Sequence, residues 1–222
     1  KAVRVSDDGI FVLGFGREAE PKAELVVRRA DGSEQRRTLD IAKRDYKIQR
    51  IDGLPQKYVA PPADVLARIR RENAEIKRVR QIDTARPYFA EGFVWPAKGR
   101  ISGVYGSQRV LNGEPKRPHY GVDIAAPAGT PVVAPAGGVV QLAEKDLYYT
   151  GGTIILDHGH GLTSAFLHMQ DVTVTVGQEL KRGDPMGTIG ATGRSTGPHL
   201  DWRINWFNVR VDAAVLVPPM GE

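Results

Sequence analysis

The stretch GVDIAAPAGTPVVAPAGGVVQLA, residues 121–143, decides the fold class. Short valine-rich runs in it alternate with turns made of glycine or of the triplet Pro-Ala-Gly, a pattern typical of short strands. The same texture continues on both sides, in FVWPAKGRISGVYG (93–106), TIILDHGHGLTSAFLHM (153–169), VTVTVGQELKRGDPMGTIGATG (172–193) and PHLDWRINWF (198–207). Closely spaced strands without intervening helical patterns predict an antiparallel β sandwich or barrel hybrid over residues 87–222.

The first third of the chain has a different organisation. The runs GIFVLGFGR (9–17) and AELVVRRADGSEQRRTLDIA (23–42) indicate β structure, with a hairpin turn at Ala30-Asp31-Gly32. We therefore expect a small basic β domain over residues 1–60. Pro61-Pro62 then opens a segment with apolar residues at helical spacing, which predicts an amphipathic helix of about five turns as a connector over residues 61–86. The whole chain is predicted to be mainly β.

The composition restricts the chemistry. The 222 residues include no cysteine, so disulfides, thiolate metal sites and a cysteine nucleophile are excluded, and any metal must be held by histidine and carboxylates. No apolar run approaches the roughly 20 residues that cross a bilayer. No signal peptide is visible at Lys1, which leaves a cytosolic protein or a mature or trimmed form of an exported one.

The net charge of +5 is unevenly distributed. Residues 1–86 contain 20 Lys and Arg against 14 Asp and Glu, whereas residues 87–222 contain 11 against 12. A basic front half indicates an anionic polymer or membrane surface as a neighbour, and a solvated basic surface is the alternative. Nucleic acid is not expected as a partner, because the basic residues are not interleaved with aromatic residues that stack on bases.

All five histidines lie in the second half, and the sequence His119-Tyr-Gly-Val-Asp123 contains the first. Pro118, Gly121 and Pro127 make a helix unfavourable here, so this segment is expected to be extended. Residues four apart in a strand share a face, so the imidazole and the carboxylate could converge on one ion. The spacing alone is also compatible with a chance pair.

A second His/Asp pair lies in GPHLDWRIN, residues 197–205. Strand alternation puts three apolar side chains on one face and four polar ones on the other: Leu200, Trp202 and Ile204 against His199, Asp201, Arg203 and Asn205. His168 closes a predicted strand over 163–167. Together these residues fit a mononuclear site with about three ligands and two further imidazoles for acid–base chemistry. His158 and His160, in DHGHG, are expected to have turn and hydrogen-bonding roles.

Residues from about Phe93 to Val217 resemble the LytM/lysostaphin-type zinc endopeptidases, which cut peptides of bacterial peptidoglycan. The segments HYGVDIAAPAGTPVVAPAGGVV, GGTIILDHGHGLTSAFLHM and VGQELKRGDPMGTIGATGRSTGPHL follow the family pattern in order and spacing. The resemblance implies that His119 and Asp123 are zinc ligands. It also implies that His168 and His199 are the catalytic histidines, which flank the metal-bound water or the scissile carbonyl. One would help to deprotonate the water, and the other would orient it or stabilise the developing oxyanion.

The chain departs from the family at one position. The family motif at residues 199–201 is His-x-His, and its second histidine is the third zinc ligand, whereas this chain has Asp201. Aspartate also ligates zinc, so we expect Asp201 to be the third ligand of one zinc ion per chain. Two carboxylates on the ion should weaken its Lewis acidity and make other divalent ions such as Mn²⁺ better tolerated.

The expected function is that of a zinc-dependent endopeptidase of peptidoglycan, located in the periplasm or associated with the cell envelope, with a signal or anchor upstream of the given chain. The main alternative is a catalytically impaired LytM-like domain that binds peptidoglycan or activates another cell-wall hydrolase. A biotinyl or lipoyl carrier, suggested by the look of AAPAGTPVVAPAGGVV, is not favoured because Lys116 and Lys145 lack the sequence setting of a modified lysine.

Overall fold

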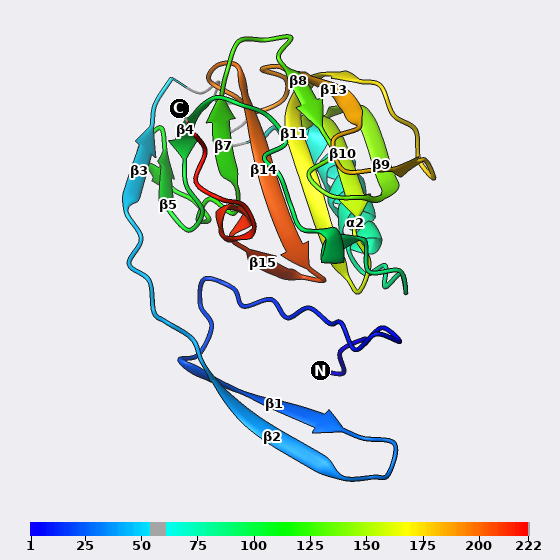
Figure 1. The fold of residues 1–222 in the computed structure, drawn as a ribbon. Helices are drawn as coiled ribbons and strands as arrows, with labels where there is room; N and C mark the ends of the chain where they lie inside the picture. The colour runs from blue at the N-terminus through cyan, green and yellow to red at the C-terminus, as the bar shows by residue number, and fades with distance from the viewer. Residues whose placement is uncertain (54–60, 222) are drawn as a thin grey trace.

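The computed structural model describes residues 1–53 and 61–221, and this part of the chain is mainly β, as predicted (Figure 1). The strands are β1 (Lys22–Arg28), β2 (Glu34–Asp40), β3 (Ile48–Ile51), β4 (Arg100–Gly103), β5 (Gln108–Leu111), β6 (Glu114–Pro115), β7 (Val122–Ala125), β8 (Pro131–Val133), β9 (Gly138–Leu147), β10 (Gly151–Asp157), β11 (Leu162–Val172), β12 (Glu179–Leu180), β13 (Pro185–Ile189), β14 (His199–Trp206) and β15 (Val209–Val211). The helical segments are α2 (Leu66–Val79) and three 3-10 helices at Ala63–Val65, Tyr88–Glu91 and Ala213–Leu216.

One large sheet dominates the structure. Its strands follow the order β12-β9-β10-β11-β14-β7-β4, while β15 pairs with β14, and β13 pairs with both β11 and β8. All of these pairs are antiparallel, which confirms the predicted sheet type. The main core contains apolar side chains of both the sheet path and the β8–β13 pair. Residues 87–221 therefore form an antiparallel β domain whose main core lies between the sheet path and the β8–β13 pair.

Strand β14 separates the core from the polar face of the sheet. Leu200, Trp202 and Ile204 are fully buried in the main core. Because side chains alternate along a strand, Asp201 and Arg203 point to the opposite face. The alternation predicted for residues 197–205 is therefore confirmed, and it positions the polar residues described below.

Helix α2 covers part of the same opposite face. Val79 is fully buried in a second apolar cluster with residues of β9, β10 and β11, including Leu142 and Leu167, so the helix docks on the large sheet. Tyr148 donates its backbone N–H to Glu72, at 2.9 Å, and anchors the middle of the helix. At 14 residues, α2 is shorter than the predicted five turns, because a 3-10 helix forms its start and it ends at Val79.

The N-terminal part agrees only partly with expectation. The β1–β2 hairpin turns at the predicted position, and Gly32 has a left-handed φ of 82° there (Figure 1). The predicted strand within 9–17 is wrong, because this segment pairs with no other strand that the structure describes. Instead, Val12 packs against the main core and Gly14 lies next to the Trp206 side chain. Strand β3 was not predicted, and it pairs in parallel with β5. The boundaries of the small β domain (1–60) and of the connector (61–86) remain predictions, and residues 54–60 lie outside the described part.

His158 and His160 have the structural roles expected of them. The ring of His158 is fully buried, with Nδ1 2.6 Å from the Gly137 carbonyl oxygen and Nε2 2.6 Å from the Ser164 hydroxyl. His160 Nε2 lies 2.8 Å from the Ala85 carbonyl oxygen. Both therefore hold the DHGHG turn against neighbouring segments. Burial lowers the pKa of His158 to about 4.

The free energy of unfolding of the metal-free chain should fall as the pH falls from about 6.5 to about 4. The unfolded chain binds a proton at His158 near the ordinary pKa of 6.5, whereas the folded chain does so only near 4. Between pH 7.5 and 5 this difference corresponds to about 2 kcal/mol. Urea unfolding at several pH values, with EDTA present, measures it. A His158→Gln variant should lose that part of the pH dependence, and equal slopes in both proteins would contradict the assignment.

Candidate metal centre and cleft

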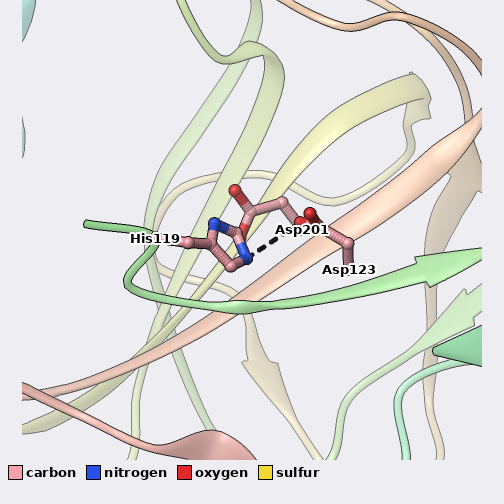
Figure 2. Close-up of side chains that lie close together, drawn as sticks. All are labelled: His119, Asp123 and Asp201. Atoms are coloured by element: carbon pink, nitrogen blue, oxygen red, sulfur yellow. Dashed lines mark ion pairs between the residues drawn. The ribbon is translucent and has the colours of Figure 1, made fainter. Parts of the chain in front are cut away.

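Three buried side chains converge where β7 and β14 lie side by side: His119, Asp123 and Asp201 (Figure 2). Asp123 on β7 lies directly opposite Asp201 on β14. His119 precedes β7, and its backbone is fixed by hydrogen bonds with the Ser107 carbonyl oxygen and the Gly106 N–H, each 2.8 Å long. His119 Nε2 is 3.1 Å from Asp123 Oδ1, and one ligand atom from each residue lies within 4.8 Å of the others. The three predicted ligands are therefore together.

Two glycines leave room for the carboxylates. A Cβ atom at Gly103 would lie 2.2 Å from Asp123 Oδ2, and one at Gly121 would lie 2.1 Å from Asp201 Oδ1. Both distances are far shorter than a non-bonded contact allows. The glycines within ISGVYG and HYGVD are thus required by the close approach of the two aspartates, and the sequence contains this signal.

The donor atoms fit a divalent cation. Within the described residues, both ring nitrogens of His119 and the Oδ1 atom of Asp123 are buried without a hydrogen-bond partner. Unpaired buried polar atoms are costly, and a bound ion is one of the few things that satisfies a cluster of them. One imidazole and two carboxylates form a ligand set that suits zinc, and the two oxygen ligands also suit harder ions.

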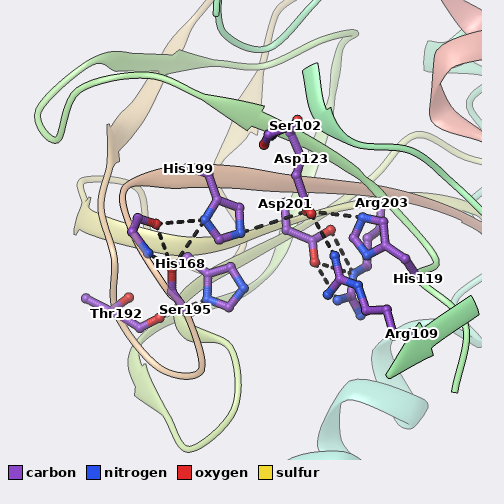
Figure 3. Close-up of polar contacts among 11 residues, drawn as sticks. Ser102, Arg109, His119, Asp123, His168, Thr192, Ser195, His199, Asp201 and Arg203 are labelled. Atoms are coloured by element: carbon purple, nitrogen blue, oxygen red, sulfur yellow. Dashed lines mark hydrogen bonds and ion pairs between the residues drawn. The ribbon is translucent and has the colours of Figure 1, made fainter. Parts of the chain in front are cut away.

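Two arginines that the sequence analysis did not single out accompany the aspartates (Figure 3). Arg109 Nη2 on β5 donates to Asp123 Oδ2 at 2.7 Å. Arg203, two residues after Asp201, donates from Nε to both of its carboxylate oxygens at 3.0 and 3.1 Å, and from Nη2 to Oδ2. Asp201 Oδ2 accepts two of these hydrogen bonds, but Asp201 Oδ1 accepts only one and Asp123 Oδ1 none, so each carboxylate keeps an oxygen for an ion. The arginines offset the negative charge that Asp201 adds to the ligand set.

Neighbouring basic groups keep both carboxylates ionised. Burial and the charge of Asp201 raise the pKa of Asp123, but the His119 ring, 3.1 Å away, and the charge of Arg109 outweigh them, so its pKa is below the usual value. Burial likewise raises the pKa of Asp201, but the charge and hydrogen bonds of Arg203 prevail and hold it well below its usual value. Both groups are therefore available as anionic ligands.

His168 and His199 lie side by side next to this cluster, with ring centroids 4.8 Å apart (Figure 3). Backbone carbonyl oxygens accept from the Nδ1 atom of each ring: Thr192 at 2.8 Å from His168 and Gly197 at 2.9 Å from His199. This contact fixes the tautomer that carries hydrogen on Nδ1 and a lone pair on Nε2. His199 Nε2 lies 3.9 Å from Asp123 Oδ1. The structure thus brings both predicted catalytic histidines to the three predicted ligands.

His168 reaches the site through an irregular backbone. Strand β11 continues beyond the predicted end at Leu167, and His168 has a left-handed φ of 66°, next to a register irregularity between β10 and β11. Such a conformation is unfavourable for a residue with a side chain and is concentrated at functional sites. Burial, together with the nearby His199, lowers the pKa of His168 to about 4, so this imidazole is neutral at physiological pH.

A cavity of about 330 Å³ opens over these groups. Asp123, His168 and His199 line it, with Arg109 and Leu111 of β5 and the loop 194–198 as walls. Gln49 and Ile51 of β3 also line it, so a segment of the N-terminal part contributes to the cleft. None of the helices in the described part of the chain is long and apolar enough to cross a membrane.

Comparisons with known proteins agree with this site. The profile of Peptidase family M23 matches residues 117–213, which contain all five site residues. A peptidoglycan DD-endopeptidase of Vibrio cholerae, ShyA, is 38% identical over 110 residues, covering 49% of this chain and 25% of its own length. The DD-carboxypeptidase/endopeptidase Mpg of Neisseria meningitidis is 37% identical over 105 residues, covering 46% and 24%. The chain thus spans about a quarter of the length of these curated relatives.

A solved structure extends the similarity to nearly the whole chain. The crystal structure of a putative peptidase M23 from Pseudomonas aeruginosa superposes with a TM-score of 0.72 at 30% identity, covering 96% of this chain and 82% of that one. The likeness therefore includes the N-terminal part as well as the domain with the site. On the profile match, this coverage and the geometry of the five residues, the chain belongs to peptidase family M23.

Proposed function

We propose that this chain is a zinc-dependent endopeptidase that hydrolyses peptide bonds in bacterial peptidoglycan. One observation carries the proposal: buried ligand atoms without partners, on His119 and Asp123, gather beside two histidines whose Nε2 lone pairs are free. Membership of a peptidase family and the printed names of the relatives ShyA and Mpg supply the reaction class and the substrate class.

In this proposal His119, Asp123 and Asp201 hold one zinc ion. When bound, the ion supplies Lewis-acid activation of the attacking water and of the scissile carbonyl. Arg109 and Arg203 keep the two carboxylates oriented and ionised. Because the ligand set is rich in oxygen, Mn²⁺ or a similar ion is a plausible replacement.

The two histidines perform the proton transfers. His199 Nε2, close to Asp123, accepts a proton from the attacking water and returns it to the leaving amine. His168, neutral and fixed by Thr192, acts as the second imidazole: its Nε2 lone pair accepts a hydrogen bond from the attacking water and orients it.

The cellular setting is also a proposal. A peptidoglycan hydrolase acts in the periplasm or elsewhere in the cell envelope. Arg28 and Arg36 of the β1–β2 hairpin are paired with Glu34 and Glu24, whereas the exposed Arg29 and Arg37 would favour contact with an anionic wall or membrane surface. No nucleic-acid partner is proposed.

Digestion of purified sacculi tests the function. The protein is incubated with sacculi alone, with a chelator, and with the chelator followed by zinc, and the products are identified by mass spectrometry. We expect new peptide termini that disappear with the chelator and return with zinc, and these termini identify the bond that is cut. No cleavage with any divalent ion would instead favour a wall-binding or hydrolase-activating domain.

A further inference from the structure

Arg100 lies on the same face of the sheet as the reacting groups. Arg100 on β4 pairs with Ala125 on β7, and Ala125 pairs with His199 on β14. Residues that are directly opposite across antiparallel strands share a face. The next positions of β7 and β14 on that face are Asp123 and Asp201, about 7 Å along the strands. Arg100 is therefore in the row beside the metal ligands, two strands away from His199.

Arg100 differs from the other two arginines of the cavity because no other side chain among the described residues engages its guanidinium. It is exposed and lines the same cavity as His199, and in the described part of the chain no acidic side chain or carbonyl oxygen pairs with it. Arg109 is bound to Asp123, and Arg194 stacks over the Tyr149 ring at 4.8 Å. Arg100 is thus the arginine of the cavity wall that is free to bind a ligand.

The cavity wall carries an excess of positive charge. Its lining includes three arginines, Arg100, Arg109 and Arg194, and a single carboxylate, Asp123, which is already paired. A divalent ion would increase this excess. A cleft lined by one sign of charge raises the local concentration of ligands of the opposite sign.

We propose that Arg100 is a specificity-determining residue that binds a carboxylate of the substrate peptide next to the scissile bond. The planar guanidinium matches a carboxylate with two parallel hydrogen bonds. The substrate class is thereby narrowed to peptides with a free carboxylate near the cleaved bond, either at the chain end or on a side chain. This inference rests on the proposed peptidase function for its choice of ligand.

The test uses synthetic peptides that carry a peptidoglycan cross-link, with one free carboxylate at the chain end and one on a side chain. Four versions are made: both carboxylates free, the chain-end carboxylate amidated, the side-chain carboxylate amidated, and both amidated. In the wild-type protein, amidation of the recognised carboxylate should lower kcat/KM about 10- to 100-fold. Arg100→Gln should lower kcat/KM for the free peptide by a similar factor and be insensitive to amidation. The singly amidated peptide that shows this loss in kcat/KM identifies whether Arg100 binds the chain-end or the side-chain carboxylate.

Arg70→Gln is the matched control, since Arg70 is an exposed arginine on α2 that does not line the cavity. It should behave like the wild type with all four peptides. Equal kcat/KM for all four peptides in the wild type would overturn the inference while leaving the peptidase function intact.

A binding measurement separates the two proposals. Fluorescence anisotropy of the free and doubly amidated peptides is measured with the zinc-loaded His199→Ala protein, with and without Arg100→Gln. Binding that depends on both Arg100 and the free carboxylate would support the inference. If the wild-type protein at the same time cleaves none of the peptides, the proposed peptidase function is wrong although the inference stands. Affinity that is unaffected by both changes, or absent throughout, would overturn the inference.

Discussion

Replacing His199 with alanine is expected to lower the rate of peptide cleavage by about 10²- to 10⁴-fold while zinc remains bound. The reason is geometric: His199 is the imidazole whose Nε2 lies 3.9 Å from Asp123 Oδ1, next to the ligand atoms, and the Gly197 carbonyl oxygen fixes its tautomer. Its side chain lines the cavity and belongs to neither the main core nor the second apolar cluster, so its removal should cost less stability than truncation of a core residue. Initial rates on cross-linked muropeptides and zinc content by mass spectrometry give the two quantities required.

His119→Ala is the informative comparison. It removes a proposed ligand rather than a proton carrier, so zinc content and cleavage should be lost together. A His199→Ala protein that loses zinc to the same extent would show that His199 is part of the ligand set. A His199→Ala protein with an unchanged rate would remove it from the reaction altogether.

The sequence predicts the sheet and its faces well because both depend on local regularities. Alternation at Leu200, Trp202 and Ile204 is sufficient to assign the buried face of β14, and with it the outward direction of Asp201. The hairpin at Gly32 follows from the left-handed φ that its turn needs. In contrast, the parallel pairing of β3 with β5 joins segments about 60 residues apart, and no local pattern specifies such a partner.

In the candidate site, too, the sequence predicts the residues but not the contacts that depend on long-range pairing. His119, Asp123, His168, His199 and Asp201 are recognisable by their residue types and by the resemblance to the family. The charge environment is not, because Arg109 comes from β5 and bonds to Asp123 across 14 residues of sequence. Arg203 lies only two residues from Asp201, but alternation predicts a shared face and not the two-oxygen contact that forms. The left-handed backbone of His168 depends on strand pairing and has no signal in its own sequence.

At Asp201, the effect of a substitution on zinc affinity can be measured separately from its effect on the free energy of unfolding of the metal-free chain. Asp201→Asn should weaken zinc binding by roughly 10²-fold, because a neutral amide replaces an anionic ligand. It should also lower the free energy of unfolding of the metal-free chain by about 3 kcal/mol, because Arg203 loses a carboxylate that is only 1% exposed. Zinc affinity from competition with a chelator and urea unfolding in EDTA measure the two effects.

The exposed pair of Arg68 and Asp146 provides the matched control. Arg68 Nη2 donates to Asp146 Oδ2 at 3.1 Å, but the Asp146 side chain is 82% exposed. Asp146→Asn should therefore change the free energy of unfolding by less than about 1 kcal/mol and leave zinc affinity unchanged. If Asp201→Asn behaved like this control, the Arg203 contact would have no energetic importance.

Asp201→His then distinguishes a ligand from a counter-charge. An imidazole restores the ligand set of the resembling family, so zinc affinity should rise if this position contacts the ion. The same change leaves Arg203 without its carboxylate, so the metal-free chain should be destabilised as in Asp201→Asn. Adding Arg203→Leu should recover part of that stability without lowering zinc affinity. If Asp201→His destabilises the chain but leaves zinc affinity unchanged, Asp201 is the counter-charge of Arg203 and not a metal ligand. In that case His119 and Asp123 alone would hold the ion.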